Sequence, residues 1–168
     1  MRNENLRVPA NRHSEPLRIR PKLSPQAARE VRRNTSLRRA RTCYGHLAGI
    51  AGVGFMDTML SLGWLDEDAE IGPDRRVRYT LSEAGALAMD ARGVDIVSAR
   101  NSAGQFAFGC LDWTERNQHL GGALGRALVV CLVEQGYLSR TAGRREVKLR
   151  KGLDEWFDRA TSKLPGQR

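Results

Sequence analysis

Two cysteine–histidine pairs give this sequence its clearest potential for chemistry. Cys43 lies three residues before His46, and Cys110 lies nine residues before His119. Side chains three residues apart share one face of a helix, so we predict that Cys43 and His46 lie on one helical face. Thiolate and imidazole are preferred ligands of Zn²⁺ and other thiophilic ions. If the fold brings the pairs together, they form a Cys₂His₂ set for one such ion; the sequence requires no other cofactor.

Packing alone explains the same four residues without a metal. A free cysteine is among the side chains most often buried and behaves as a small hydrophobic group. A histidine that opens a helix in both places can serve only to satisfy a backbone group. Both interpretations remain open at this point. The third cysteine, Cys131, stands in the apolar run Ala127–Val133, and we predict that it lies in the core.

The two histidines belong to an internal repeat. His46–Leu65 aligns without a gap with His119–Leu138, at an offset of 73 residues. Each copy begins His-Leu-small-Gly, continues with apolar residues at helical spacing and ends in Gly-aromatic-Leu. A charged segment with a double arginine follows, and then an alternating stretch. This order predicts helices over 46–62 and 119–135, each followed by a hairpin and a further helix.

We therefore predict an α+β fold made of two winged-helix-like units in tandem, packed about an approximate twofold axis. Ser24-Pro25 is a helix-start signal, and Ser82 is an N-cap signal. A second start at Thr35 or Ser36 predicts a helix that runs to Tyr44. The predicted organisation is a basic, largely disordered arm at 1–35 with a short helix at 25–34, a first repeat at 36–93, a connector at 94–109 and a second repeat at 110–164.

The net charge of +9 is concentrated at one end of the chain. Residues 1–41 hold 12 of the 28 Lys and Arg but 3 of the 19 Asp and Glu, so the remainder is formally neutral. A basic arm on a neutral body suits a nucleic acid or another polyanion, because arginine releases counterions from phosphates. The candidate contacts are the arginines of the arm and of the two hairpins: Arg32, Arg33, Arg38, Arg39, Arg41, Arg75, Arg76, Arg144 and Arg145. A solubilising leader and a solvated hairpin are the alternatives.

Several function classes find no support in the sequence. We find no Gly-rich phosphate loop and no paired nucleophile and base, so we do not expect an enzyme. The longest apolar run is far shorter than the roughly 20 residues that a membrane-spanning helix needs. Three cysteines without a signal peptide favour a reducing cytoplasm over a disulfide-linked scaffold.

Two motifs resemble one known family. They are Arg41-Thr-Cys-Tyr-Gly-His-Leu-Ala-Gly49 and Cys110-Leu-Asp-Trp-Thr-Glu-Arg-x-x-His-Leu-Gly-Gly122. They are similar to the C-terminal part of a group of bacterial ArsR-type winged-helix transcriptional regulators, and the resemblance covers about 37–157. Gly45 stands where that group usually has Asp. The group also carries a DNA-reading winged helix ahead of the first motif, and the residues before Arg41 show no such pattern.

The resemblance implies a bacterial, dimeric transcriptional regulator, or the effector and dimerisation part of one, that acts on DNA directly or through a partner. The helix predicted over 46–62 has no Lys or Arg, so we do not expect it to read bases. One alternative is a stand-alone protein-interaction module that lacks its own DNA reader and forms a homodimer, or a heterodimer with a full-length relative. A second is a metal or thiol sensor domain. We predict no membrane partner.

Overall fold

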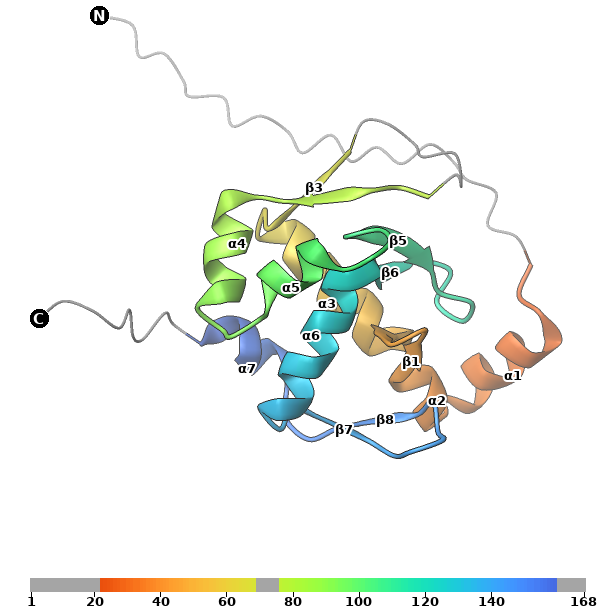
Figure 1. Cartoon of the computed structure of the whole chain (residues 1–168). Helices are drawn as coiled ribbons and strands as arrows, with labels where there is room; N and C mark the ends of the chain where they lie inside the picture. Colours follow the sequence, from red (N-terminus) through yellow and green to blue (C-terminus); the bar gives the residue numbers. More distant parts are fainter. Residues whose placement is uncertain (1–21, 69–75, 160–168) are drawn as a thin grey trace, which may run out of the picture.

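The computed structural model describes residues 22–68 and 76–159 and shows an α+β protein, as predicted. Helices alternate with four two-stranded antiparallel sheets, which pair β1 with β2, β3 with β4, β5 with β6 and β7 with β8 (Figure 1). The elements in chain order are α1 (Pro25–Arg33), α2 (Ser36–Arg39), β1 (Arg41–Cys43), β2 (His46–Ala48), α3 (Gly49–Ser61), β3 (Leu65–Glu67), β4 (Tyr79–Leu81), α4 (Glu83–Asp90), α5 (Ile96–Asn101), β5 (Phe108–Leu111), β6 (Gln118–Gly121), α6 (Gly122–Glu134), β7 (Leu138–Arg140), β8 (Val147–Leu149) and α7 (Leu153–Asp158).

Three predicted helix starts are confirmed. The side chain of Thr35 accepts a hydrogen bond from the backbone N–H of Arg38 at 3.2 Å, at the start of α2. The side chain of Ser24 accepts a hydrogen bond from the backbone N–H of Ala27 at 3.1 Å, with a proline in the first turn of α1. The side chain of Ser82 accepts one from Gly85 at 3.0 Å at the start of α4. Each cap satisfies a backbone donor that the first helical turn leaves without a partner.

Other predicted helix bounds are wrong. The helix expected to run to Tyr44 ends at Arg39, and a strand follows it. The two long helices begin at Gly49 and Gly122 rather than at the histidines, which lie in strands β2 and β6. Both glycines have positive φ, 78° and 90°, and a helix cannot extend backwards through that conformation.

Each long helix therefore follows a hairpin that the sequence pattern did not reveal. The β1–β2 hairpin precedes α3, and the β5–β6 hairpin precedes α6. The predicted connector at 94–109 contains α5 and the first residues of β5. Residues 1–21 of the predicted arm, Arg75 of the first double arginine and the end of the second repeat lie outside the described residues.

The two repeats contact each other reciprocally. We call the β3–β4 hairpin the first wing and the β7–β8 hairpin the second wing. The first wing pairs with strand β5 of the second repeat. The backbone N–H of Gly109 donates to the carbonyl of Val77 at 2.9 Å, and the backbones of Arg78 and Phe108 form an antiparallel β-bridge. The second wing pairs with β1 in the same way. The backbones of Arg41 and Glu146 form an antiparallel β-bridge, and the N–H of Thr42 donates to the carbonyl of Arg145 at 2.7 Å.

The core lies between the repeats, with α3 and α6 running through the middle of the molecule (Figure 1). Trp156 of α7 is fully buried and contacts the rings of Phe55 and Trp64. Arg92, which follows α4, donates to the carbonyls of Trp156 at 2.9 Å and Phe157. These bonds satisfy the end of a short helix and join the first repeat to the last element of the second.

None of the helices in the described part of the chain is long and apolar enough to cross a membrane.

Candidate metal centre and basic surface

The first half of the candidate site is the β1–β2 hairpin. Cys43 and His46 are directly opposite each other as cross-strand partners, not neighbours on a helical face as predicted. Tyr44 and Gly45 form the two-residue turn between them, with φ of 49° and 94°. A two-residue hairpin turn with positive φ at both positions is favoured by glycine. The turn therefore holds a thiol and an imidazole on the same side of the hairpin.

The second half is the β5–β6 hairpin, where Cys110 and His119 are again cross-strand partners. A longer loop joins these strands, and it contains Asp112. The equal register in both hairpins has a simple consequence. Each repeat presents one cysteine opposite one histidine, although three residues separate them in one case and nine in the other.

The fold brings the two pairs together. One potential ligand atom from each of Cys43, His46, Cys110 and His119 lies within 4.8 Å of all the others. The two imidazole rings have centroids 5.1 Å apart and are tilted by 40°. Both histidines are buried, whereas both cysteines are partly exposed. The fold therefore brings together four residues whose meeting the sequence left open, and whether they bind an ion is a separate question.

Three of the four ring nitrogens of His46 and His119 have no hydrogen-bond partner in the described part of the chain. Among the described residues, no hydrogen bond reaches Nδ1 of His46 or either ring nitrogen of His119. These side chains are 2% and 1% exposed, so water does not replace the missing partners. A buried polar atom without a partner costs free energy and is uncommon in folded proteins.

Asp112 supports the site from one side. Its carboxylate accepts hydrogen bonds from the backbone of Gly49 at 2.7 Å and of Thr114 at 2.9 Å, and it pairs with Arg41 at 2.5 Å. Burial alone would raise the pKa of Asp112, but these donors and the Arg41 charge hold it at about 2. Its second oxygen lies 3.5 Å from Nδ1 of His119. Asp112 is thus a fixed negative charge directly behind one histidine.

Arg41 does not lie where it was predicted. It was a candidate polyanion contact, but the structure buries it completely. Besides Asp112, its guanidinium donates to the hydroxyl of Thr114 at 3.2 Å and the carbonyl of Leu37 at 3.1 Å. A buried guanidinium is tolerated because a carboxylate and these acceptors replace its water. Sequence reasoning missed this pair, and only the presence of both residues in the two motifs hinted at it.

Close approach and burial also shift the pKa values of three residues in the cluster. The Cys110 thiol and the His119 imidazole lower the pKa of Cys43 to about 4, and the same pairing raises the pKa of Cys110. Burial, followed by the charge of His119, lowers the pKa of His46 to about 4. The site therefore favours a thiolate beside a neutral imidazole, which are the forms in which cysteine and histidine bind metals.

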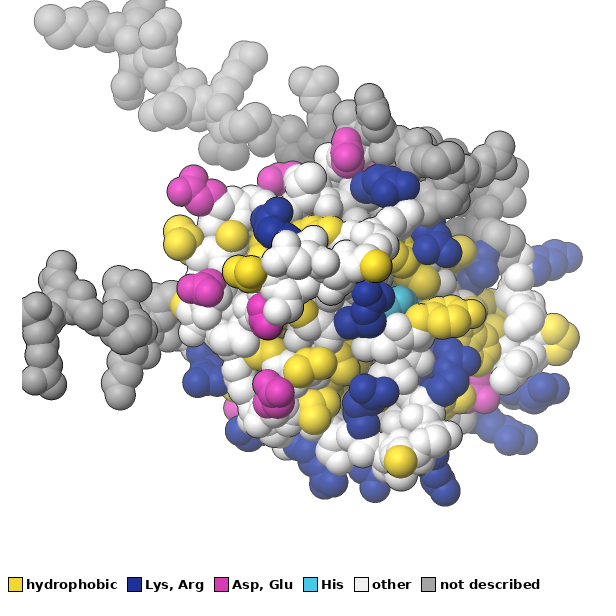
Figure 2. Space-filling view, viewed as in Figure 1, with side chains coloured by type: hydrophobic (Ala, Val, Ile, Leu, Met, Phe, Trp, Pro, Cys, Tyr) yellow, Lys and Arg dark blue, Asp and Glu magenta, His cyan; other side chains and the backbone are white. Residues whose placement is uncertain are grey.

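A second feature is a basic surface that two distant segments form together. The second wing lies against residues 40–42, where the N–H of Val147 donates to Ala40 at 3.1 Å and Arg145 donates to the carbonyl of Thr42 at 3.2 Å. Lys and Arg side chains follow the lower and right-hand edge of the molecule, which holds the second wing, α1 and α2 (Figure 2). The exposed basic residues of these elements are Arg29, Arg32, Arg33, Arg39, Arg140, Arg144, Arg145, Lys148, Arg150 and Lys151.

The remaining predicted arginines lie elsewhere. Arg38 is held by Glu115 through two hydrogen bonds of 2.9 and 3.0 Å. Arg76 stacks on Phe108 at 4.6 Å and lies near the metal candidate rather than on the basic surface. The prediction missed Arg29 of α1 and four residues in and just after the second wing: Arg140, Lys148, Arg150 and Lys151. The run from 140 to 151, with six basic residues and one acidic residue, was the signal for the last four.

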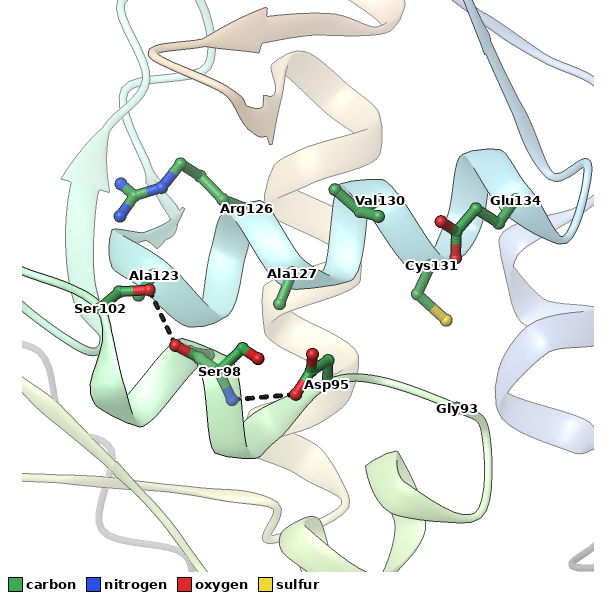
Figure 3. A pocket seen from close by; sticks show the side chains of 11 residues that line it. Gly93, Asp95, Ser98, Ser102, Ala123, Arg126, Ala127, Val130, Cys131 and Glu134 are labelled. Carbon is green, nitrogen blue, oxygen red and sulfur yellow. Dashed lines mark hydrogen bonds between the residues drawn. The ribbon is translucent and has the colours of Figure 1, made fainter.

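A cavity of about 250 Å³ between α5 and α6 is a weaker candidate site (Figure 3). Some of its polar groups already bond within the α5 segment: Ser98 donates its N–H to Asp95 at 2.9 Å, and Ser102 donates to the carbonyl of Ser98 at 2.8 Å. Arg126 points away from α5 in this view. The other charged residues that line the cavity, Arg126 and Glu134, both come from α6.

Comparison with known proteins gives one relative. The chain is 33% identical over 140 residues to YdfF of Bacillus subtilis (strain 168), an uncharacterized HTH-type transcriptional regulator. The match takes in 83% of this chain and 59% of the relative, so the chain spans less than two thirds of that protein's length. No family model matches the chain. No solved structure matches it either. The chain is therefore similar in sequence to a transcriptional regulator of helix-turn-helix type.

Proposed function

We propose that this chain is part of a DNA-associated transcriptional regulator and that its basic surface contacts DNA phosphates. The observation that carries the proposal is the packing of the second wing against residues 40–42. It joins the basic side chains of α1 and α2 to those of residues 140–151. Similarity to an HTH-type regulator supports the same function. Phosphate contacts of this kind give affinity and orientation without sequence preference.

The proposal includes ArsR-type ancestry, for which the support is the pair of motifs at Arg41–Gly49 and Cys110–Gly122. It also includes a tandem pair of winged-helix-like units with an approximate internal twofold. The reciprocal pairing of each wing with the other repeat's hairpin is what such symmetry requires. Regulators of this ancestry act as dimers, so we propose a homodimer or a heterodimer with a full-length relative.

In this proposal, neither α3 nor α6 reads DNA bases. Much of α3 and α6 is buried in the core, and Arg126 is the only Lys or Arg in either helix. A recognition helix needs exposed polar side chains that reach base edges. The same observation favours the alternative function, a protein-interaction module that reaches DNA through a partner.

The test is fluorescence anisotropy with labelled duplexes, both random and from the gene's own upstream region, over a salt series. Arg144→Glu and Arg100→Glu are a matched pair, since both side chains are exposed and each change lowers the net charge by two. Arg144 lies on the basic surface and Arg100 lies on α5. We expect Arg144→Glu to weaken binding about fivefold at physiological salt and to reduce the log–log salt slope by about one.

The control variant should change affinity by less than about twofold. Equal losses in both variants would mean that net charge, not this surface, drives binding. Binding that does not depend on salt, or no binding of the full chain to any duplex, would favour the interaction module.

A further inference from the structure

We infer that Cys43, His46, Cys110 and His119 form a Zn²⁺ site that joins the two repeats. This inference does not depend on the proposed contact with DNA. It rests on the position of four ligand atoms, two from each repeat, within 4.8 Å of one another. The alternative, that the four side chains only pack, makes different demands on their hydrogen bonds and burial.

The donor set suits zinc. Two sulfur and two imidazole ligands are a common combination in closed, four-coordinate zinc sites. Two thiolates supply the charge that neutralises a divalent ion, so no further anion is needed. Ca²⁺ and Mg²⁺ prefer oxygen ligands, which this cluster does not place among the four atoms.

The spacing also fits. With Zn–S near 2.3 Å and Zn–N near 2.0–2.1 Å, the ligand atoms of a tetrahedral site lie about 3.3–3.8 Å apart. The upper limit of 4.8 Å between any two candidate atoms exceeds this by at most about 1.5 Å. Small rotations of four side chains on two short hairpins can close that difference. The hairpins themselves already hold each cysteine opposite its histidine.

A packing role leaves the histidines unexplained. Nδ1 of His46 and both ring nitrogens of His119 are buried without a hydrogen bond to any residue in 22–68 or 76–159. Cys131 shows what a packing cysteine looks like in this protein, because it is buried at 3% exposure and its thiol donates to the carbonyl of Arg92 at 3.3 Å. Cys43 and Cys110 are instead partly exposed, which gives an ion a path into the site.

Asp112 completes the arrangement. Zinc-bound histidines usually donate their second ring N–H to a carboxylate or carbonyl, which fixes the tautomer and orients the ring. The carboxylate of Asp112 lies 3.5 Å from Nδ1 of His119 and is held in place by Arg41 and the backbone of Gly49. This position leaves Nε2 of His119 for the ion. His46 has no such carboxylate in its own turn, since glycine occupies position 45.

An ion bound here would connect β1–β2 of one repeat to β5–β6 of the other. Each wing already pairs with the hairpin of the opposite repeat. Zinc would therefore stabilise the contact between the repeats and, with it, the position of the second wing beside α2.

The first experiment is a Co²⁺ titration of the full chain, purified with a reductant and stripped of metal by a chelator. We expect one Co²⁺ per chain, with the absorption of tetrahedral cobalt bound to thiolate, and its displacement by one equivalent of Zn²⁺. Cys43→Ser should weaken Zn²⁺ binding more than about 100-fold, because loss of a direct ligand exceeds the effect of losing a supporting residue. Cys131→Ser is the matched control, retains a donor for Arg92 and should leave the spectrum unchanged.

A measurement without substitutions covers the case in which a variant fails to fold. Zn²⁺ should slow alkylation of Cys43 and Cys110 in the native chain on the order of tenfold, because a coordinated thiolate is a poor nucleophile. The proposal is overturned if Zn²⁺ leaves both alkylation rates unchanged. It is also overturned if Cys43→Ser binds Co²⁺ with the same spectrum and stoichiometry as the original chain.

Discussion

The two repeats are alike where they touch each other and different where they face solvent. Both begin with a hairpin that places a cysteine opposite a histidine, and both continue into a 13-residue helix. The wings differ. The described part of the first wing exposes Asp66, Glu67 and Asp68, whereas six basic residues lie in 140–151 of the second.

This difference separates two roles. The hairpins must fit each other, because each packs against the long helix and the wing of the other repeat. The outer faces of the wings carry no such constraint and can differ in charge. We therefore assign the contact between repeats, with its candidate metal centre, to the shared features and the proposed DNA contact to the feature that only the second repeat has.

The largest expected effect concerns an asymmetry inside the contact itself. Arg41 and Asp112 form a buried ion pair that has no counterpart in the opposite direction. Counted from the cysteine of each hairpin, Phe108 stands at the position of Arg41, and Gly45 stands at the position of Asp112. Arg41→Met should lower the free energy of unfolding by about 3–5 kcal/mol, because it leaves the Asp112 charge buried without its partner. Urea denaturation of the metal-free chain measures this.

The double variant Arg41→Met with Asp112→Asn is the control for that prediction. It removes both charges, so it should be more stable than Arg41→Met alone. A loss below about 1 kcal/mol in the single variant would show that the hydrogen bonds from Gly49 and Thr114 suffice to hold the carboxylate.

The next effect tests whether the shared features behave alike. A Cβ on Gly52 would lie 2.3 Å from the carbonyl oxygen of Leu47 and 3.4 Å from Cβ of His119. A Cβ on Gly125 would lie 2.4 Å from the carbonyl oxygen of Leu120 and 3.0 Å from Cβ of His46. Alanine at either position should therefore destabilise the chain by about 1–3 kcal/mol, with similar losses in the two repeats.

Gly54→Ala is the matched control for these glycines. It lies in the same helix as Gly52, and a Cβ there has nothing within 4 Å. Higher helix propensity should stabilise this variant by up to about 1 kcal/mol. Thermal or urea denaturation distinguishes the outcomes. A large loss at Gly125 with none at Gly52 would contradict equivalent contacts in the two repeats.

Sequence alone predicted the repeat and the α+β class, because these follow from patterns that occur twice. It named the four candidate ligands but left open whether the fold brings them together. It placed His46 and His119 on helices because an apolar stretch with helical spacing follows each of them. The positive φ of Gly49 and Gly122 prevents the two helices from starting earlier, at the histidines. The sequence shows a glycine at each position but does not reveal its φ. The hairpins were missed for the same reason.

The burial of Arg41 could not be predicted either. Its partner Asp112 is 71 residues away in the chain, and arginine in a basic segment usually faces solvent. The reciprocal pairing of the wings likewise depends on contacts between distant backbone segments. The local pattern identified each wing but carried no information about the strand beside it.

The smallest effect distinguishes the two histidines of the candidate site. His119 has Asp112 behind it, and His46 has Gly45 in its turn. Burial, with the charge of His119, lowers the pKa of His46 to about 4, below the value near 6.5 of an unfolded chain. As the pH falls below 6.5, the unfolded state therefore takes up a proton that the folded state does not, and stability decreases. Between pH 7 and pH 5 we expect a loss of about 1–2 kcal/mol from this residue. Urea denaturation at both pH values, with chelator present, gives the difference. His46→Gln should remove this part of the pH dependence, and the same dependence in that variant would show that other groups cause it.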